Sequence, residues 1–167
     1  MSSVRRLARR SGSAGAEHSL GGCHVPRDLR VVRIQNELDG ASPQVRLNLE
    51  YVVIANLGTT KENVAGWTLE GRTAAGERRH RYRFPLVVAG RAYTLDPGEL
   101  IYVVTGTGVD QFRPANTQGD PESRPHFDFH QNLSWSVWGN GGDIAALYDS
   151  HDLLVAEATV PSPLRRP

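Results

Sequence analysis

The feature that most constrains the fold is the stretch over residues 48–69, where short apolar runs are cut by turn residues. Residues 51–54 form an aromatic and β-branched run, which suits a buried pleated sheet. Residues 56–60 supply turn chemistry, and residues 64–69 resume an extended pattern. Trp67 is the expected centre of the core, because one buried indole removes a large apolar area from water.

Similar short runs recur along the chain between glycine- and proline-containing turns, and no convincing helix interrupts them. The pattern therefore predicts an all-β antiparallel sandwich. Residues 105–132 are expected to be a long irregular loop, and turns are expected at residues 39–40, 95–99 and 139–143. The expected strands cover residues 28–34, 45–55, 64–71, 79–84, 100–104, 133–138, 144–148 and 153–160.

The 167 residues fit one domain with tails. We expect a disordered basic arm over residues 1–27, the folded domain over residues 28–160 and a flexible tail over residues 161–167. The single cysteine, Cys23, permits no internal disulfide. No apolar run follows the N-terminal arginines, so a cytoplasmic location is the default expectation, with export not excluded. No segment has the apolar length of a membrane helix.

Five separate pieces of the chain form one ordered pattern, at residues 50–56, 64–69, 82–85, 95–108 and 138–147. In this order they resemble the lamin tail domain family in its free-standing bacterial form. The resemblance covers roughly residues 28–160 and implies an immunoglobulin-like β-sandwich. It further implies binding or tethering to nucleic acid, proteins or cell-surface assemblies, and no catalysis. The chain lacks the heptad repeat of the nuclear lamins, so it cannot form their coiled-coil filament.

The best candidate site is a stripe of arginines at Arg79, Arg81 and Arg83. Alternate residues of a strand share a face, so the three guanidiniums are expected about 7 Å apart, a spacing that suits successive phosphates of nucleic acid or another anionic polymer. Arg78 and the N-terminal arginines could add to the stripe. The competing interpretation is the solvated face of an edge strand, where basic residues deter aggregation.

Charge is distributed unevenly along the chain. Residues 1–83 hold 14 Lys and Arg against 8 Asp and Glu, hence +6, whereas residues 84–167 hold 5 against 10, hence −5. A basic first half can mark an anionic partner. A β-sandwich places strands from both halves of the chain side by side, so the basic and acidic charges are mixed in space. The asymmetry along the sequence is therefore also compatible with a surface that has no charged side.

Other constellations favour structural interpretations. His126, Asp128 and His130 share a face of an extended segment and could hold zinc, but Phe127 and Phe129 then form the core side of an ordinary half-buried strand. The acidic residues at 143, 149 and 152 lack the spacing of a calcium loop, and Asp143 suits a turn. No Gly-x-Ser-x-Gly elbow is present, and residues 106–108 are not a phosphate loop.

Two tryptophans and a tyrosine, Trp135, Trp138 and Tyr148, could form a stacking platform. The two tryptophans are three residues apart, so one is expected in the core and the other exposed. The sequence as a whole predicts a non-enzymatic binding module with no cofactor or metal. The alternatives are a protein–protein adaptor that presents a sheet edge or the 105–132 loop, a cell-surface-associated structural domain and a small metal-dependent hydrolase.

Overall fold

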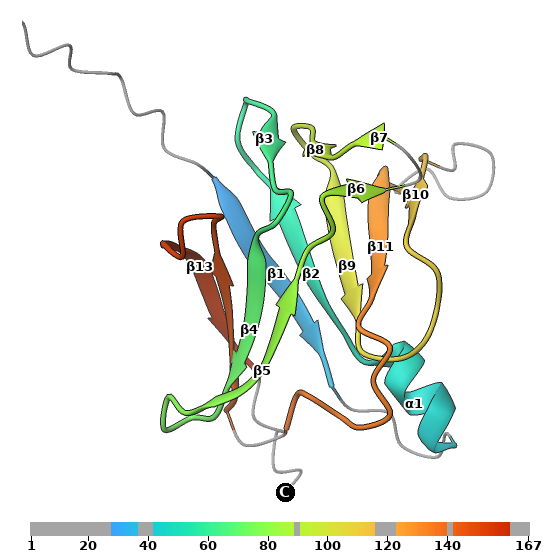
Figure 1. Cartoon of the computed structure of the whole chain (residues 1–167), viewed down its shortest axis with the longest axis vertical. Coiled ribbons are helices and arrows are strands. Elements are labelled where there is room, and N and C mark those ends of the chain that lie inside the picture. The colour runs from blue at the N-terminus through green and yellow to red at the C-terminus, as the bar shows by residue number, and fades with distance from the viewer. Residues whose placement is uncertain (1–27, 37–41, 89–90, 116–122, 140–141, 161–167) are drawn as a thin grey trace, which may run out of the picture.

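The computed structural model describes residues 28–36, 42–88, 91–115, 123–139 and 142–160. The expected arm, the expected tail and the turn at residues 39–40 lie outside these ranges. Two sheets face each other across a common core (Figure 1). The all-β immunoglobulin-like sandwich predicted from the sequence is therefore confirmed.

The larger sheet has five strands in the order β1 (Leu29–Gln35), β2 (Tyr51–Asn56), β9 (Leu100–Val104), β11 (His126–His130) and β10 (Gln111–Arg113). The smaller has four, β13 (Leu154–Thr159), β12 (Ile144–Tyr148), β4 (Thr68–Arg72) and β5 (Arg78–Arg83). Two further ladders pair β3 (Glu62–Asn63) with β8 (Thr94–Leu95), and β6 (Val87–Val88) with β7 (Arg91–Ala92).

Alternate residues of the two sheets fill the core. Trp67 is 2% exposed, as expected of a central residue. Tyr93 packs edge-on against Phe127 and Phe129, with ring centroids 4.7 and 5.0 Å apart. Phe84, which follows β5, lies 5.7 Å from Phe129 of the opposite sheet. Aromatic pairs of this kind stabilise beyond the area they bury, so this cluster joins the two sheets.

The expected strand over residues 45–55 is wrong in its first half. Residues Pro43–Leu49 form helix α1, and the strand begins only at Tyr51. Proline at the first helical position fixes a helical φ without losing a needed donor. The apolar alternation at Val45, Leu47 and Leu49 suggested a strand, but Leu47 alone of these three is buried.

The expected loop over residues 105–132 holds two strands, β10 and β11. β11 pairs parallel with β9, and β10 pairs antiparallel with β11. The described strands therefore include a parallel pair, β9 with β11, which the antiparallel prediction missed. Residue His126 is in register with Leu100, so the chain returns to the start of β9 before β11 begins.

The expected strand over residues 133–138 does not form. The cause is Glu50, whose buried carboxylate accepts hydrogen bonds from the backbone N–H groups of Val137 and Trp138 at 2.8 and 3.4 Å. The hydroxyl groups of Thr105 and Ser136 donate to the same carboxylate. These amides are satisfied by a side chain, so the segment packs against the core without joining a ladder.

Candidate functional site

The predicted arginine stripe lies on β5, the edge strand of the smaller sheet. Arg81 is opposite Glu70 of β4, and Arg83 is opposite Thr68. Both arginines are exposed, whereas Tyr82 between them is partly buried against the core. Burial, with a smaller contribution from Asp110, raises the pKa of Tyr82 well above its usual range. The alternation expected from the sequence therefore holds in this half of the strand.

The alternation breaks at Arg79. His80 pairs with Gly71 and Arg78 pairs with Arg72, so Arg79 is the extra residue of a β-bulge. Its guanidinium reaches Asp143 at 2.8 Å, and the same carboxylate oxygen accepts the backbone N–H of Gly139. Asp143 thus has the structural turn role expected from the sequence. Arg79 is committed to a buried carboxylate and does not continue the stripe in register.

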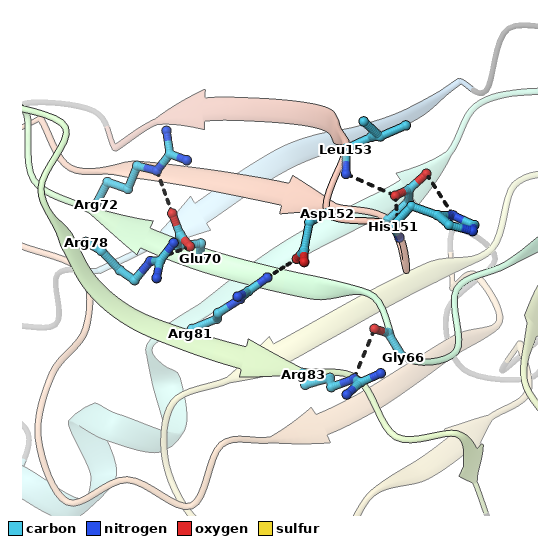
Figure 2. Close-up of polar contacts among 10 residues, drawn as sticks. Gly66, Glu70, Arg72, Arg78, Arg81, Arg83, His151, Asp152 and Leu153 are labelled. Carbon is cyan, nitrogen blue, oxygen red and sulfur yellow. Dashed lines mark hydrogen bonds and ion pairs between the residues drawn. The ribbon is translucent and has the colours of Figure 1, made fainter.

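Glu70 of β4 holds two arginines at one end of the β4–β5 pair (Figure 2). Its side chain is 3% exposed and lies between the guanidiniums of Arg72 and Arg78, at 2.7 and 2.6 Å. Sequence reasoning included Arg78 as an addition to the stripe and missed Arg72. The signal for Arg72 was present, since it lies two residues after Glu70 and so shares its face of the strand.

Arg81 and Arg83 have less buried partners (Figure 2). Arg81 forms an ion pair with Asp152, whose side chain is 71% exposed. Arg83 donates from Nε to the backbone carbonyl of Gly66 at 3.3 Å. A hollow of about 310 Å³ lies beside the two guanidiniums, where β5 faces the β12–β13 turn and Ser150.

We call these five side chains the arginine surface: Arg72, Arg78, Arg79, Arg81 and Arg83. Three carboxylates pair with them, those of Glu70, Asp143 and Asp152, so five positive charges less three negative charges leave +2. The pairs hold the guanidiniums in place and at the same time weaken their field.

The β12–β13 turn is built by another carboxylate. Asp149 accepts the backbone N–H groups of His151 and Leu153 at 2.8 and 3.1 Å. This is turn chemistry of the kind expected for aspartate. Asp143 and Asp149 therefore serve turns, Asp143 and Asp152 pair with Arg79 and Arg81, and the three carboxylates do not form a metal-binding group.

The histidines of β11 go to separate partners. Phe127 and Phe129 face the core, as the structural interpretation predicted. His126 contacts the carbonyl of Arg124 through Nδ1 at 2.8 Å, and Asp128 pairs with Arg113 of β10. His130 packs against Gly108. Within the described ranges, no group of three or more His, Cys, Asp or Glu side chains could hold a metal ion.

The two tryptophans divide as predicted. Trp138 is 2% exposed and lies in the core, whereas Trp135 is 46% exposed. Trp135 meets the ring of His80 edge-on, with centroids 5.3 Å apart. Burial lowers the pKa of His80, and a hydrogen bond with Gln131 opposes this shift. Tyr148 contacts Arg72 instead, so the three aromatic residues do not form one stacking platform.

No helix in the described part of the chain is long and apolar enough to cross a membrane.

A known family model matches most of the chain. Residues 26–162 match the family model described as Lamin Tail Domain. No curated protein matches the chain. The matched span contains both sheets, α1 and the whole arginine surface.

Proposed function

We propose that this chain, which belongs to the Lamin Tail Domain family, is a non-enzymatic binding or tethering module for an anionic polymer such as nucleic acid. The arginine surface is the proposed contact. The observation that carries the proposal is the excess of guanidinium over carboxylate on the β4–β5 edge, five against three.

The ion pairs leave donors for a ligand. A guanidinium has five N–H groups, and Arg72 and Arg78 are held to Glu70 through Nε. Their terminal amino groups can still donate to phosphate oxygens. Preordered arginines lose less side-chain entropy when a polymer binds. The neighbouring carboxylates oppose this gain, so we expect weak, strongly salt-dependent binding.

A fluorescence-anisotropy titration with a short labelled duplex DNA, at low and near-physiological salt, tests the proposal. The variant is Arg81→Gln with Arg83→Gln, because neither change leaves a buried carboxylate without its cation. The matched control is Arg30→Gln with Lys61→Gln, which removes two exposed charges from the opposite sheet and a loop.

We expect the arginine variant to bind DNA more weakly. The slope of log affinity against log salt concentration should fall by an amount that corresponds to roughly one to two phosphate contacts, while the control changes neither the affinity nor the slope. Absence of binding at low salt would overturn the proposal. Equal loss in the control would mean that net charge, and not this surface, drives the association.

The second candidate is a protein–protein adaptor, and exposed apolar side chains favour it. Leu153 and Leu154 are 65% and 53% exposed at the β12–β13 turn, and Val109 is 77% exposed in the loop that follows β9. An adaptor would bind its partner with little dependence on salt, because apolar burial is not screened. Partner pull-down would follow if DNA does not bind.

A further inference from the structure

The opposite face of the molecule carries a second set of side chains that the arginine surface does not use. On the five-stranded sheet, the residues that alternate with the core residues of β2, β9 and β11 point away from the sandwich. Tyr51, Tyr102, His126 and Asp128 belong to this outer face. Tyr102 lies at its centre, in register with Val53 on one side and Asp128 on the other.

Two adjoining hollows form a groove over these strands. They measure about 600 and 510 Å³, and both are lined by Tyr102, Ser123 and His126. The floor of one hollow includes Val53 and Ala55, which are buried although they lie on the outer face. We call this feature the outer groove. Its volume and its mixture of apolar and polar walls are those of a small-ligand site.

Aromatic rings line the middle of the outer groove. The rings of Tyr51 and Tyr102 are 5.5 Å apart and inclined at 58°, and His126 meets Tyr102 at 5.0 Å and 62°. These tilts leave no parallel slot into which a flat base could slide between two rings. A single ring face can still receive the C–H face of a pyranose.

Tyr51 and Tyr102 each bring a phenolic hydroxyl group to the outer groove. Burial raises the pKa of Tyr102, so its hydroxyl stays protonated and can donate. A hydrogen-bond donor in this groove suits a ligand rich in oxygen atoms.

The charges of the outer groove favour an anion. Arg33 and Arg124 line one hollow, and Arg113 lines the other together with Asp128. Three arginines less one carboxylate give +2. Arg113 pairs with Asp128, whereas the Arg33 guanidinium lies over the ring of Tyr51, 5.6 Å from its centroid. Asp128 also accepts from Gln111, which fixes an acceptor at this end.

We propose that the outer groove binds an acidic sugar, that is, a pyranose ring that carries a carboxylate. The apolar ring face lies on Tyr102, and the carboxylate meets Arg33 and Arg124. The ring hydroxyl groups meet Asp128 and Asn48, which also line the groove. This inference does not depend on the proposed function, because it uses the other sheet and none of the arginine surface.

The test is a calorimetric titration of the whole chain with a galacturonic acid trimer. The galactose trimer is the matched ligand, since it lacks only the carboxylates. The variants are Tyr102→Leu, and Arg33→Gln with Arg124→Gln. Tyr148→Leu is the matched control, because Tyr148 is a half-buried strand tyrosine of the smaller sheet, outside the outer groove, with the Arg72 guanidinium 5.4 Å from its ring centroid.

We expect the galacturonate trimer to bind and the galactose trimer to bind at least about tenfold more weakly, since charge-assisted hydrogen bonds are the stronger ones. Tyr102→Leu and the double arginine variant each weaken binding about tenfold, and Tyr148→Leu leaves it unchanged. In the unmodified protein, amide chemical shifts move at Tyr51, Tyr102 and His126, which localises the sugar without relying on a variant.

Three outcomes would overturn the inference: no binding of the acidic trimer, equal binding of both trimers, or shift changes confined to the arginine surface. The duplex DNA titration separates the two proposals. DNA binding that survives Tyr102→Leu but is lost with Arg81→Gln and Arg83→Gln leaves both intact, whereas sugar binding that is lost with Arg81→Gln and Arg83→Gln contradicts this one.

Discussion

Glu50 offers the sharpest test of how this fold is held together. Its carboxylate is 4% exposed and has no cationic partner among the described residues. Hydrogen bonds come from the Thr105 hydroxyl and the Val137 amide at 2.8 Å each, from the Trp138 amide at 3.4 Å and from the Ser136 hydroxyl. One side chain therefore joins the start of β2 to two other segments.

Replacing Glu50 by alanine removes all of these acceptors. The hydroxyl groups can turn toward other partners, but the two backbone amides cannot, and each buried unsatisfied donor costs about 1–3 kcal/mol. The 3.4 Å contact is long, so its loss lies at the low end of that range. We therefore expect Glu50→Ala to lower the free energy of unfolding by roughly 3–5 kcal/mol, with cavity formation included.

Urea unfolding followed by tryptophan fluorescence measures this change in the free energy of unfolding. Trp138 is a suitable probe, because it lies in the segment over residues 133–138 that the Glu50 carboxylate holds. Glu50→Gln keeps one acceptor oxygen for the amides, and we expect it to cost about 1–2 kcal/mol. Glu77→Ala is the control, since Glu77 is exposed in a turn. A loss below about 1 kcal/mol for Glu50→Ala would refute the reasoning, because water would then be replacing the carboxylate at no cost.

Three further substitutions test other parts of the fold. Asn56 is fully buried, donates to the carbonyls of Thr60 and Leu95 and accepts from Gly58, so Asn56→Ala should cost roughly 2–4 kcal/mol in the same urea assay. A Cβ on Gly108 would lie 2.2 Å from the ring of His130, so Gly108→Ala should lower the melting temperature, and adding His130→Ala should restore part of the loss. Burial lowers the pKa of His80 below 6.5, so the unfolded chain binds more protons and stability falls as pH drops through 6.5; His80→Phe should flatten that fall in pH-dependent melting curves.

The sequence predicted the elements whose residues satisfy their own local rules. β9 is an uninterrupted apolar run, and Trp67 is central because nothing else in its stretch is as large. The turn before β9 also formed as expected, with Gly98 at φ 83°. In each case the local pattern and the tertiary contacts favour the same conformation.

Two of the misses, residues 133–138 and the bulge at Arg79, have a partner distant in sequence as their physical cause. The sequence of residues 133–138 has the pattern of a strand. In the structure, the Glu50 carboxylate, which lies 86 positions before Ser136, accepts hydrogen bonds from the Ser136 hydroxyl group and from the two backbone amides that follow it. The alternation over residues 45–49 was equally ambiguous, and Pro43 was the local sign of a helix. The bulge at Arg79 could not be read from β5, because it is set by the pairing with β4.

The arginines around the bulge at Arg79 are of two kinds, which differ in the burial of their partners. The partners of Arg72, Arg78 and Arg79 are carboxylates whose side chains are 3–4% exposed, so removing these guanidiniums would leave buried negative charge, which is costly. Arg81 and Arg83 have an exposed carboxylate and a backbone carbonyl as partners, and exposed pairs contribute little to stability. The arginines of this edge therefore have two different roles. The first group stabilises the sheet edge, and the second group can exchange its partners for a ligand at little cost to stability. Loss of binding in a variant of the first kind would report the fold, and only the second kind reports the surface.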